Sequence, residues 1–215
     1  MIDRAEYPSP VSKLIDHGPV KERVDATWFD YVGHYQLGEM DVPVLIELMY
    51  ERDIDVTSPA EMAAPVHACR ALGQFGDIAA IDALVGLFIE DENDELISNA
   101  QVALCMFGAP SLSAMKRFFL HPKTSPGSQI RTLEGIEKLA QTCPQVRDEA
   151  VQFLMQGLAH YRNYKPDVNG FLVHYLVELK ATEAAGVMKK AMKSGRVSKD
   201  LYESWDEVKA ELGMG

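Results

Sequence analysis

His174 and Glu178 are the first residues to consider for chemistry, because their spacing places an imidazole and a carboxylate on one face of a helix. Two such groups four residues apart can bind one metal ion. Pairs of this kind are also frequent on ordinary helices, and His67, another histidine in a helical pattern, has Ala71 at the same spacing. We therefore expect no metal site at either histidine.

An acidic run at 91–95, DENDE, has the composition of a calcium loop. An EF-hand loop requires Gly at its sixth position and Glu at its twelfth. Counted from Asp91, those positions hold Leu96 and Val102. A polar turn leading into a helix explains the run better, since the positive end of the helix dipole favours acidic residues.

The three cysteines, Cys69, Cys105 and Cys143, lie far apart and form no CxxC pair. Each falls within a helical apolar pattern, which indicates small buried side chains rather than a disulfide framework or a zinc site. The sequence also contains no phosphate-binding Gly-rich loop and no GxSxG motif. We therefore expect no catalytic residues, no bound metal and no cofactor.

An internal repeat organises the elements that carry these residues. Ala-Leu followed by Phe-Gly occurs at 71–76 and again 32 residues later at 103–108, with looser copies at 139–144 and 175–180. Self-similarity at this period is typical of stacked helix-turn-helix units, and each copy ends an apolar stripe of helical spacing. The stripe predicts the following core positions: Ala64, Ala68, Ala71, Leu72, Phe75, Leu96, Ala100, Ala103, Leu104, Phe107, Thr132, Ile136, Leu139, Ala140, Cys143, Val168, Leu172, Tyr175, Leu176 and Leu179.

The repeat predicts an all-α fold, a right-handed α-solenoid of the HEAT-like or armadillo type with about five helix pairs. Neighbouring pairs must stack, because one pair cannot bury its own apolar face. We expect residues 1–24 to form an N-terminal arm or cap and residues 25–215 to form a single repeat domain. The predicted pairs are 40–51 with 64–75, 78–89 with 94–107, 111–120 with 128–142, 145–160 with 168–179, and 183–193 with 199–212.

Prolines, glycines and helix-capping residues agree with these helix boundaries. Pro43 and Pro65 suit the first turn of a helix, where the missing N–H costs nothing. Gly76 and Gly108 suit the left-handed position that follows a helix end. Asn93 or Asp94 can cap the helix that follows the acidic run.

The stretch HACRALGQF running into GDIAAIDALVGLF (67–88) resembles a HEAT-type repeat of the short bacterial kind. APVHACRALGQ, CPQVRDEAV, NGFLVHYLVELKATEAA and SWDEVKAELG further resemble an uncharacterised bacterial family of HEAT-like proteins, over roughly residues 25–214. Longer members of that family carry a C-terminal cysteine-rich SEC-C zinc motif, and this sequence has no such cysteine tail. The family brings no established activity. The His-Glu dipeptides of HEAT-type iron hydroxylases are also absent, since no histidine here precedes Glu.

Composition and charge restrict the partners. The chain is 47% hydrophobic and 25% charged, and it has no apolar run near 18 residues or apolar leader at its start, so we expect a cytoplasmic protein without membrane contact. Residues 1–100 hold 6 Lys/Arg and 20 Asp/Glu, a balance of −14, whereas residues 101–215 hold 15 and 12, a balance of +3. The acidic excess repels phosphate and disfavours a nucleic-acid partner. It either solubilises the protein or steers a basic partner to the N-terminal half.

The resemblance implies that the second helix of each pair lines a concave face. On these helices, the positions outside the core stripe carry both polar and apolar side chains. This mixture favours a recognition patch over a plain solvated face. Packing between helices, or a register shifted by one residue, is the alternative. The candidate partner-binding residues are His67, Arg70, Gln74, Asn99, Val102, Met106, Lys138, Phe171, His174 and Glu178.

These observations favour a non-enzymatic scaffold that binds a protein or peptide partner in its groove. Two other hypotheses use the same architecture: an enzyme acting on a small ligand, as HEAT-like bilin lyases do, and a self-assembling structural repeat. Trp28 and Trp205, near the two ends, either seal terminal layers of the core or anchor a partner. The sequence leaves the oligomeric state open.

Overall fold

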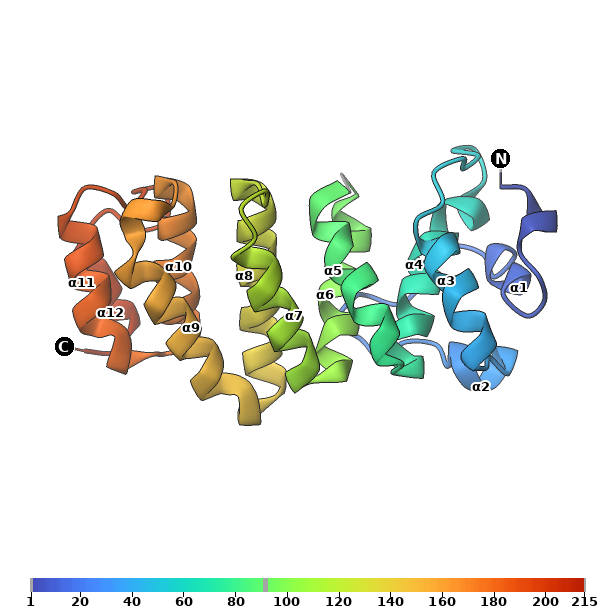
Figure 1. The fold of residues 1–215 in the computed structure, drawn as a ribbon, viewed down its shortest axis with the longest axis horizontal. Helices are drawn as coiled ribbons and strands as arrows, with labels where there is room; N and C mark the ends of the chain where they lie inside the picture. Colours follow the sequence, from blue (N-terminus) through green and yellow to red (C-terminus); the bar gives the residue numbers. More distant parts are fainter. Residues whose placement is uncertain (1, 91–92, 215) are drawn as a thin grey trace. The chain divides into compact units, whose positions relative to one another are not determined.

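The computed structural model describes residues 2–90 and 93–214, so Asp91 and Glu92 of the acidic run lie outside the described residues. Over these ranges the chain forms twelve α-helices linked by turns and short 3-10 helices, and it contains no β-strand (Figure 1). The helices are α1 (Ser12–Ile15), α2 (Tyr31–Tyr35), α3 (Val42–Met49), α4 (Pro59–Phe75), α5 (Ile81–Glu90), α6 (Asp94–Phe107), α7 (Ala109–Phe119), α8 (Pro126–Thr142), α9 (Arg147–Ala159), α10 (Pro166–Glu178), α11 (Ala185–Lys193) and α12 (Trp205–Glu211).

The expectation of an all-α fold is confirmed. Each predicted pair corresponds to two consecutive helices, from α3 with α4 through to α11 with α12, although α12 is shorter than expected. Helix contacts run mostly between elements that are close in the chain order. In the described part of the chain, no helix combines the length and the apolar character that a membrane crossing requires.

The chain divides into two compact units, which we call unit 1 (Met1–Ser111) and unit 2 (Leu112–Gly215). Residues 101–111 carry no charged side chain, so the charge imbalance of the sequence follows this division. Unit 1 holds 6 Lys/Arg and 20 Asp/Glu, whereas unit 2 holds 15 and 12. The strongly acidic character of the protein therefore belongs to unit 1.

Within unit 1, α4 is the central helix. It packs against α3 and α6, while α5 packs against α6 (Figure 1). The short helices α1 and α2 also pack against α4, because the N-terminal part of the chain contributes buried side chains to the same core. Val11, Leu14 and Ile15 are fully buried, so the residues expected to form an arm or cap are part of the folded unit.

Within unit 2, α8 and α10 pack side by side, and α9 contacts both of them. Helix α11 packs against α9, and α12 packs against α11. The ring of Phe119, on α7, meets the ring of Phe153, on α9, edge to face at a centroid distance of 5.5 Å. Alternate helices therefore lie next to each other, as α4 and α6 do in unit 1.

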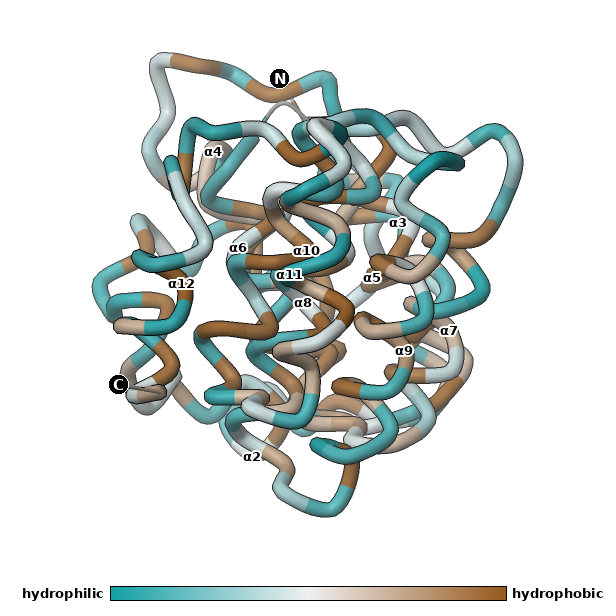
Figure 2. The backbone as a smooth tube through the Cα atoms, turned by 90° about the vertical axis from the view of Figure 1, so that its left-hand side faces the viewer, coloured by the Kyte–Doolittle hydropathy of each residue, from teal (hydrophilic) through white to brown (hydrophobic). Residues whose placement is uncertain are grey.

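The apolar stripe read from the repeat is the core. Of its twenty positions, all are buried except Phe75, Phe107 and Cys143, which are half-buried at helix ends. Leu104 and Leu176 have no exposed surface. Hydrophobic and hydrophilic stretches accordingly alternate along the helices (Figure 2), as expected where one face of each helix is buried.

Most of the predicted helix boundaries are also confirmed. Gly76 follows α4 with φ 76°, in the left-handed region, and Asn93 caps α6 by accepting from two backbone N–H groups. The placement of Pro65 is wrong. Helix α4 begins at Pro59 after the Ser58 cap, so Pro65 lies inside the helix, which starts five residues earlier than predicted.

Candidate functional site

The predicted groove residues of unit 1 lie under the chain's own N-terminal segment. His67 and Arg70 on α4, and Asn99 on α6, are almost completely buried, and Gln74 is half-buried. Residues 17–31, which we call the covering segment, supply most of their partners. A partner-binding role for these four residues stays a prediction, and in the structure they hold a segment of the same chain.

Arg70 is the centre of this arrangement. Its guanidinium donates to Asn99 Oδ1 at 2.7 Å, to the carboxylate of Glu22 at 3.2 Å and to the backbone carbonyl of Glu22 at 2.9 Å. The same guanidinium lies over the ring of Trp28, 5.0 Å from its centroid. The buried charge is therefore paired with an anion and hydrogen-bonded on several sides, as a charge removed from water must be.

His67 binds the covering segment through both ring nitrogens. Its Nε2 lies 2.8 Å from the carbonyl of Gly18, and its Nδ1 lies 2.7 Å from the Tyr31 hydroxyl. A carbonyl can only accept, so Nε2 carries the proton and Nδ1 accepts from Tyr31. Burial lowers the pKa of His67 to about 4 and raises the pKa of Tyr31 to about 12. Both groups are therefore neutral at physiological pH.

Gln74 binds main-chain atoms of the covering segment. Its side-chain amide donates to the carbonyl of Phe29 at 2.8 Å and accepts from the N–H of Tyr31 at 3.0 Å. These two hydrogen bonds use backbone groups that nearly every residue has. The face of α4 therefore holds an irregular piece of chain partly through its backbone and partly through the side chains of Glu22 and Trp28.

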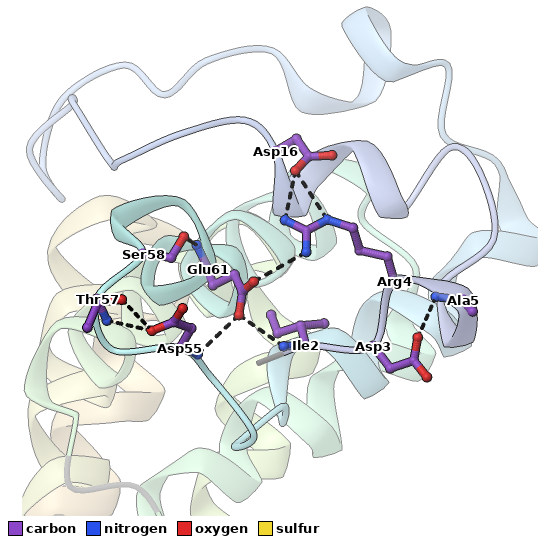
Figure 3. Close-up of polar contacts among 9 residues, drawn as sticks. All are labelled: Ile2, Asp3, Arg4, Ala5, Asp16, Asp55, Thr57, Ser58 and Glu61. Carbon is purple, nitrogen blue, oxygen red and sulfur yellow. Dashed lines mark hydrogen bonds and ion pairs between the residues drawn. The ribbon is translucent and has the colours of Figure 1, made fainter.

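A second contact ties the beginning of the chain to the start of α4 (Figure 3). The buried carboxylate of Glu61 accepts from the N–H groups of Ile2 at 2.9 Å and Asp55 at 3.1 Å, and from Arg4 at 3.2 Å. These donors hold the pKa of Glu61 below its ordinary value. Arg4 also pairs with Asp16 at 2.9 Å, so one guanidinium connects two parts of the N-terminal region.

In unit 2 the predicted residues lie on a face that is partly open. Lys138 is on α8, and Phe171, His174 and Glu178 follow the exposed side of α10, the neighbouring helix. Glu178 is exposed, whereas the other three are half-exposed. We call these four residues, together with Glu134, Tyr175 and Tyr202, the α8–α10 face. Val102 and Met106 of unit 1 lie on α6. Val102 is half-exposed, and Met106 is 49% exposed.

Aromatic rings form the middle of the α8–α10 face. Phe171 stacks on Tyr175 at a centroid distance of 5.8 Å, and His174 lies 5.1 Å from Tyr175. His174 Nδ1 also meets the hydroxyl of Tyr202 at 3.1 Å. Tyr202 comes from the loop between α11 and α12, which the repeat pattern did not single out.

Carboxylates crowd the same region. Glu137 on α8 is 7% exposed, and burial together with the charge of Glu178 raises its pKa. Its side chain accepts a hydrogen bond from Gln141. Lys138 pairs with Glu134 at 2.8 Å, one turn away on the same helix. The apolar stripe gave no sign that Glu137 is buried, because a glutamate next to core positions is ordinarily solvated.

The structure offers little for metal or nucleophilic chemistry in the residues it describes. Over 2–90 and 93–214, no group of three or more His, Cys, Asp or Glu side chains is arranged to bind a metal ion. Cys69, Cys105 and Cys143 are free thiols, and burial raises the pKa of Cys69 far above its usual range. A protonated, buried thiol is a packing residue and a poor nucleophile.

Comparisons with protein-family models, with curated proteins and with solved structures find no match to this chain. What the structure establishes about class is an all-helical protein whose helices pack largely in sequential order.

Proposed function

We propose that this protein is a non-enzymatic scaffold that binds a protein or peptide partner on the exposed faces of the second helices of its pairs. The finer architecture belongs to the same proposal: a HEAT-like, right-handed α-solenoid of five pairs, α3–α4 through α11–α12. The sequential packing of these pairs and the 32-residue repeat support that assignment.

One observation carries the proposal. The second-helix face of α4 already holds an irregular segment of polypeptide, through Gln74 to main-chain atoms and through Arg70 to a carboxylate, a carbonyl and a tryptophan ring. This is the set of contacts by which a helical surface would hold a peptide from another protein.

The repeat register relates this occupied face to the one in unit 2. His67, Arg70 and Gln74 correspond to Phe171, His174 and Glu178, each 104 residues later along the chain. On α10 these positions are partly solvent-exposed, and they gather rings and charges on a surface adjacent to α8. Exposed aromatic side chains beside polar ones are typical of binding surfaces. The α8–α10 face is accordingly the proposed site.

A display selection tests the proposal. The full chain is immobilised and challenged with a random peptide library, with counter-selection against a Phe171→Ala/His174→Ala double variant. Hydrogen exchange then maps the recovered peptides, and we expect protection in α8 and α10. Recovery of no peptide, or protection confined to other helices, would refute the proposed site. Circular dichroism of the double variant serves as the folding control.

A further inference from the structure

We propose that the α8–α10 face binds a basic peptide, with a lysine or arginine side chain seated against the rings of Phe171 and His174 and paired with the carboxylate of Glu178. This inference rests on the proposed function and specifies its partner.

In the part of the chain that the structure describes, the carboxylate of Glu178 is a charge without a partner of opposite sign. Glu178 is exposed at the end of α10, and among the described residues its carboxylate has no hydrogen-bond or ion-pair partner. Its charge nevertheless acts on the buried carboxyl of Glu137 and on the hydroxyls of Tyr175 and Tyr202. A cation bound beside Glu178 would relieve this crowding of like charge.

The aromatic rings beside Glu178 also favour a cation. A cation over the face of an aromatic ring is attracted by the ring quadrupole, and the flat guanidinium of arginine can also stack on it. Phe171 and His174 present such rings one turn apart on α10, the buried Tyr175 supports them, and Tyr202 extends the surface from the loop before α12. The same combination occurs inside unit 1, where Arg70 lies over Trp28 and pairs with Glu22.

The cations already on α8 leave the surface acidic. Lys138 is engaged by Glu134 at 2.8 Å, and Arg131 lies two turns before Lys138 on the same side of the helix. Against these two cations stand three carboxyl groups: Glu134 between them on α8, the largely buried Glu137 beside it, and Glu178 on α10. An acidic peptide would meet net repulsion here, whereas a basic one would find complementary charge.

Three fluorescent peptide pools test the inference, identical except that their polar positions carry Lys/Arg, Gln or Glu. Anisotropy titrations with the full chain are compared for the natural sequence, Glu178→Gln and Asp148→Asn. Asp148 is the matched control, because its side chain is 92% exposed on α9 and its loss changes the net charge of unit 2 equally. This comparison separates the site from the general attraction of the acidic unit 1 for basic peptides.

We expect the Lys/Arg pool to bind most tightly, Glu178→Gln to weaken it about 5-fold and Asp148→Asn by less than about 2-fold. Phe171→Leu, which keeps an apolar side chain but removes the ring, should weaken it about 3-fold. Thermal unfolding checks that each variant is folded.

Equal losses for Glu178→Gln and Asp148→Asn would overturn the inference. Tighter binding of the Gln or Glu pool, lost in Phe171→Leu, would refute a basic partner and leave the proposed binding function standing. If none of the pools binds, the basic partner is refuted, and the display selection decides the proposed function separately. Dimers in sedimentation that Glu178→Gln dissociates would show that a second copy occupies the face, which also overturns the inference.

Discussion

Replacing Arg70 with Ala should destabilise unit 1 more than any surface change in the same region. The substitution removes the guanidinium that Asn99, Glu22 and Trp28 share. It leaves the side-chain oxygen of Asn99 without its donor and the Glu22 carboxylate without its cation. The covering segment would then be held mainly by His67 and Gln74.

The expected size follows from the burial of the pair. Arg70 is 1% exposed, and Glu22 keeps 29% of its side chain exposed. Removing one partner of a buried ion pair costs about 3–5 kcal/mol, and the partial exposure of Glu22 places this pair near the lower end. With a urea dependence of about 2 kcal/mol per molar for a unit of this size, a loss of about 3 kcal/mol lowers the urea midpoint by about 1.5 M.

Tryptophan fluorescence can follow the two units separately, because Trp28 lies in unit 1 and Trp205 in unit 2. Urea titrations in a Trp205→Phe background report on unit 1 through Trp28. Far-UV circular dichroism provides a second signal, since Arg70→Ala also changes the surroundings of Trp28. The matched control is Arg23→Ala, which removes an arginine that is 84% exposed and pairs with Asp25.

An exposed pair of that kind contributes less than about 1 kcal/mol, so Arg23→Ala should move the midpoint by less than about 0.5 M. If Arg70→Ala shifts the midpoint of unit 1 no further than Arg23→Ala does, the network does not hold the covering segment in place. The interpretation of the α4 face as a surface that holds polypeptide would then lose its support.

Three further predictions concern two glycines, the pH dependence of unit 1 and a pair of carboxyl groups. Gly76→Ala should lower the free energy of unfolding by about 1 kcal/mol, because φ is 76° at that position. Gly186→Ala lies inside α11 with open space around the added methyl group, so it should raise the free energy of unfolding by about 0.5 kcal/mol. Thermal unfolding shows whether the two shifts have opposite signs. His67 has a folded pKa near 4, below that of the unfolded chain, so protons bind the unfolded state preferentially. Unit 1 should therefore lose about 3 kcal/mol as pH falls from about 6.5 to about 4, and urea titrations of His67→Gln should show a flatter profile. Glu178→Gln should lower the pKa of Glu137, measured by carboxyl carbon NMR, and an unchanged value would contradict the proximity of the two groups.

The helical framework could be predicted because its signal is local. Apolar residues at helical spacing, such as Ala68, Leu72 and Leu104, needed only the repeat register to be placed in the core. Pro65 misled the prediction of where α4 begins because a proline is most often found at a helix start. The stronger signal, Ser58 before Pro59, lies seven residues earlier.

The candidate site was only partly predictable, for a physical reason. The spacing of His67 and Arg70 showed that they share a helix face, but not that the face is covered. Their partners, Gly18 and Glu22, lie almost fifty residues earlier in a segment without regular structure, where no periodicity marks a contact. The burial of Glu137 depends in the same way on neighbours from other helices, which one helical stripe does not reveal.

The two hydrogen bonds of Gln74 bear on how the covering segment can change during evolution. Both bonds involve backbone amide atoms, so they do not depend on the side chain at position 29. The ring of Phe29 is held separately, by contacts with the rings of His17 and Tyr31 at centroid distances of 4.6 and 5.2 Å. Proline is excluded at position 31, because it has no N–H to donate to the side chain of Gln74. Three side chains of this stretch are therefore constrained as well as its backbone: Glu22 and Trp28 by Arg70, and Phe29 by its aromatic neighbours.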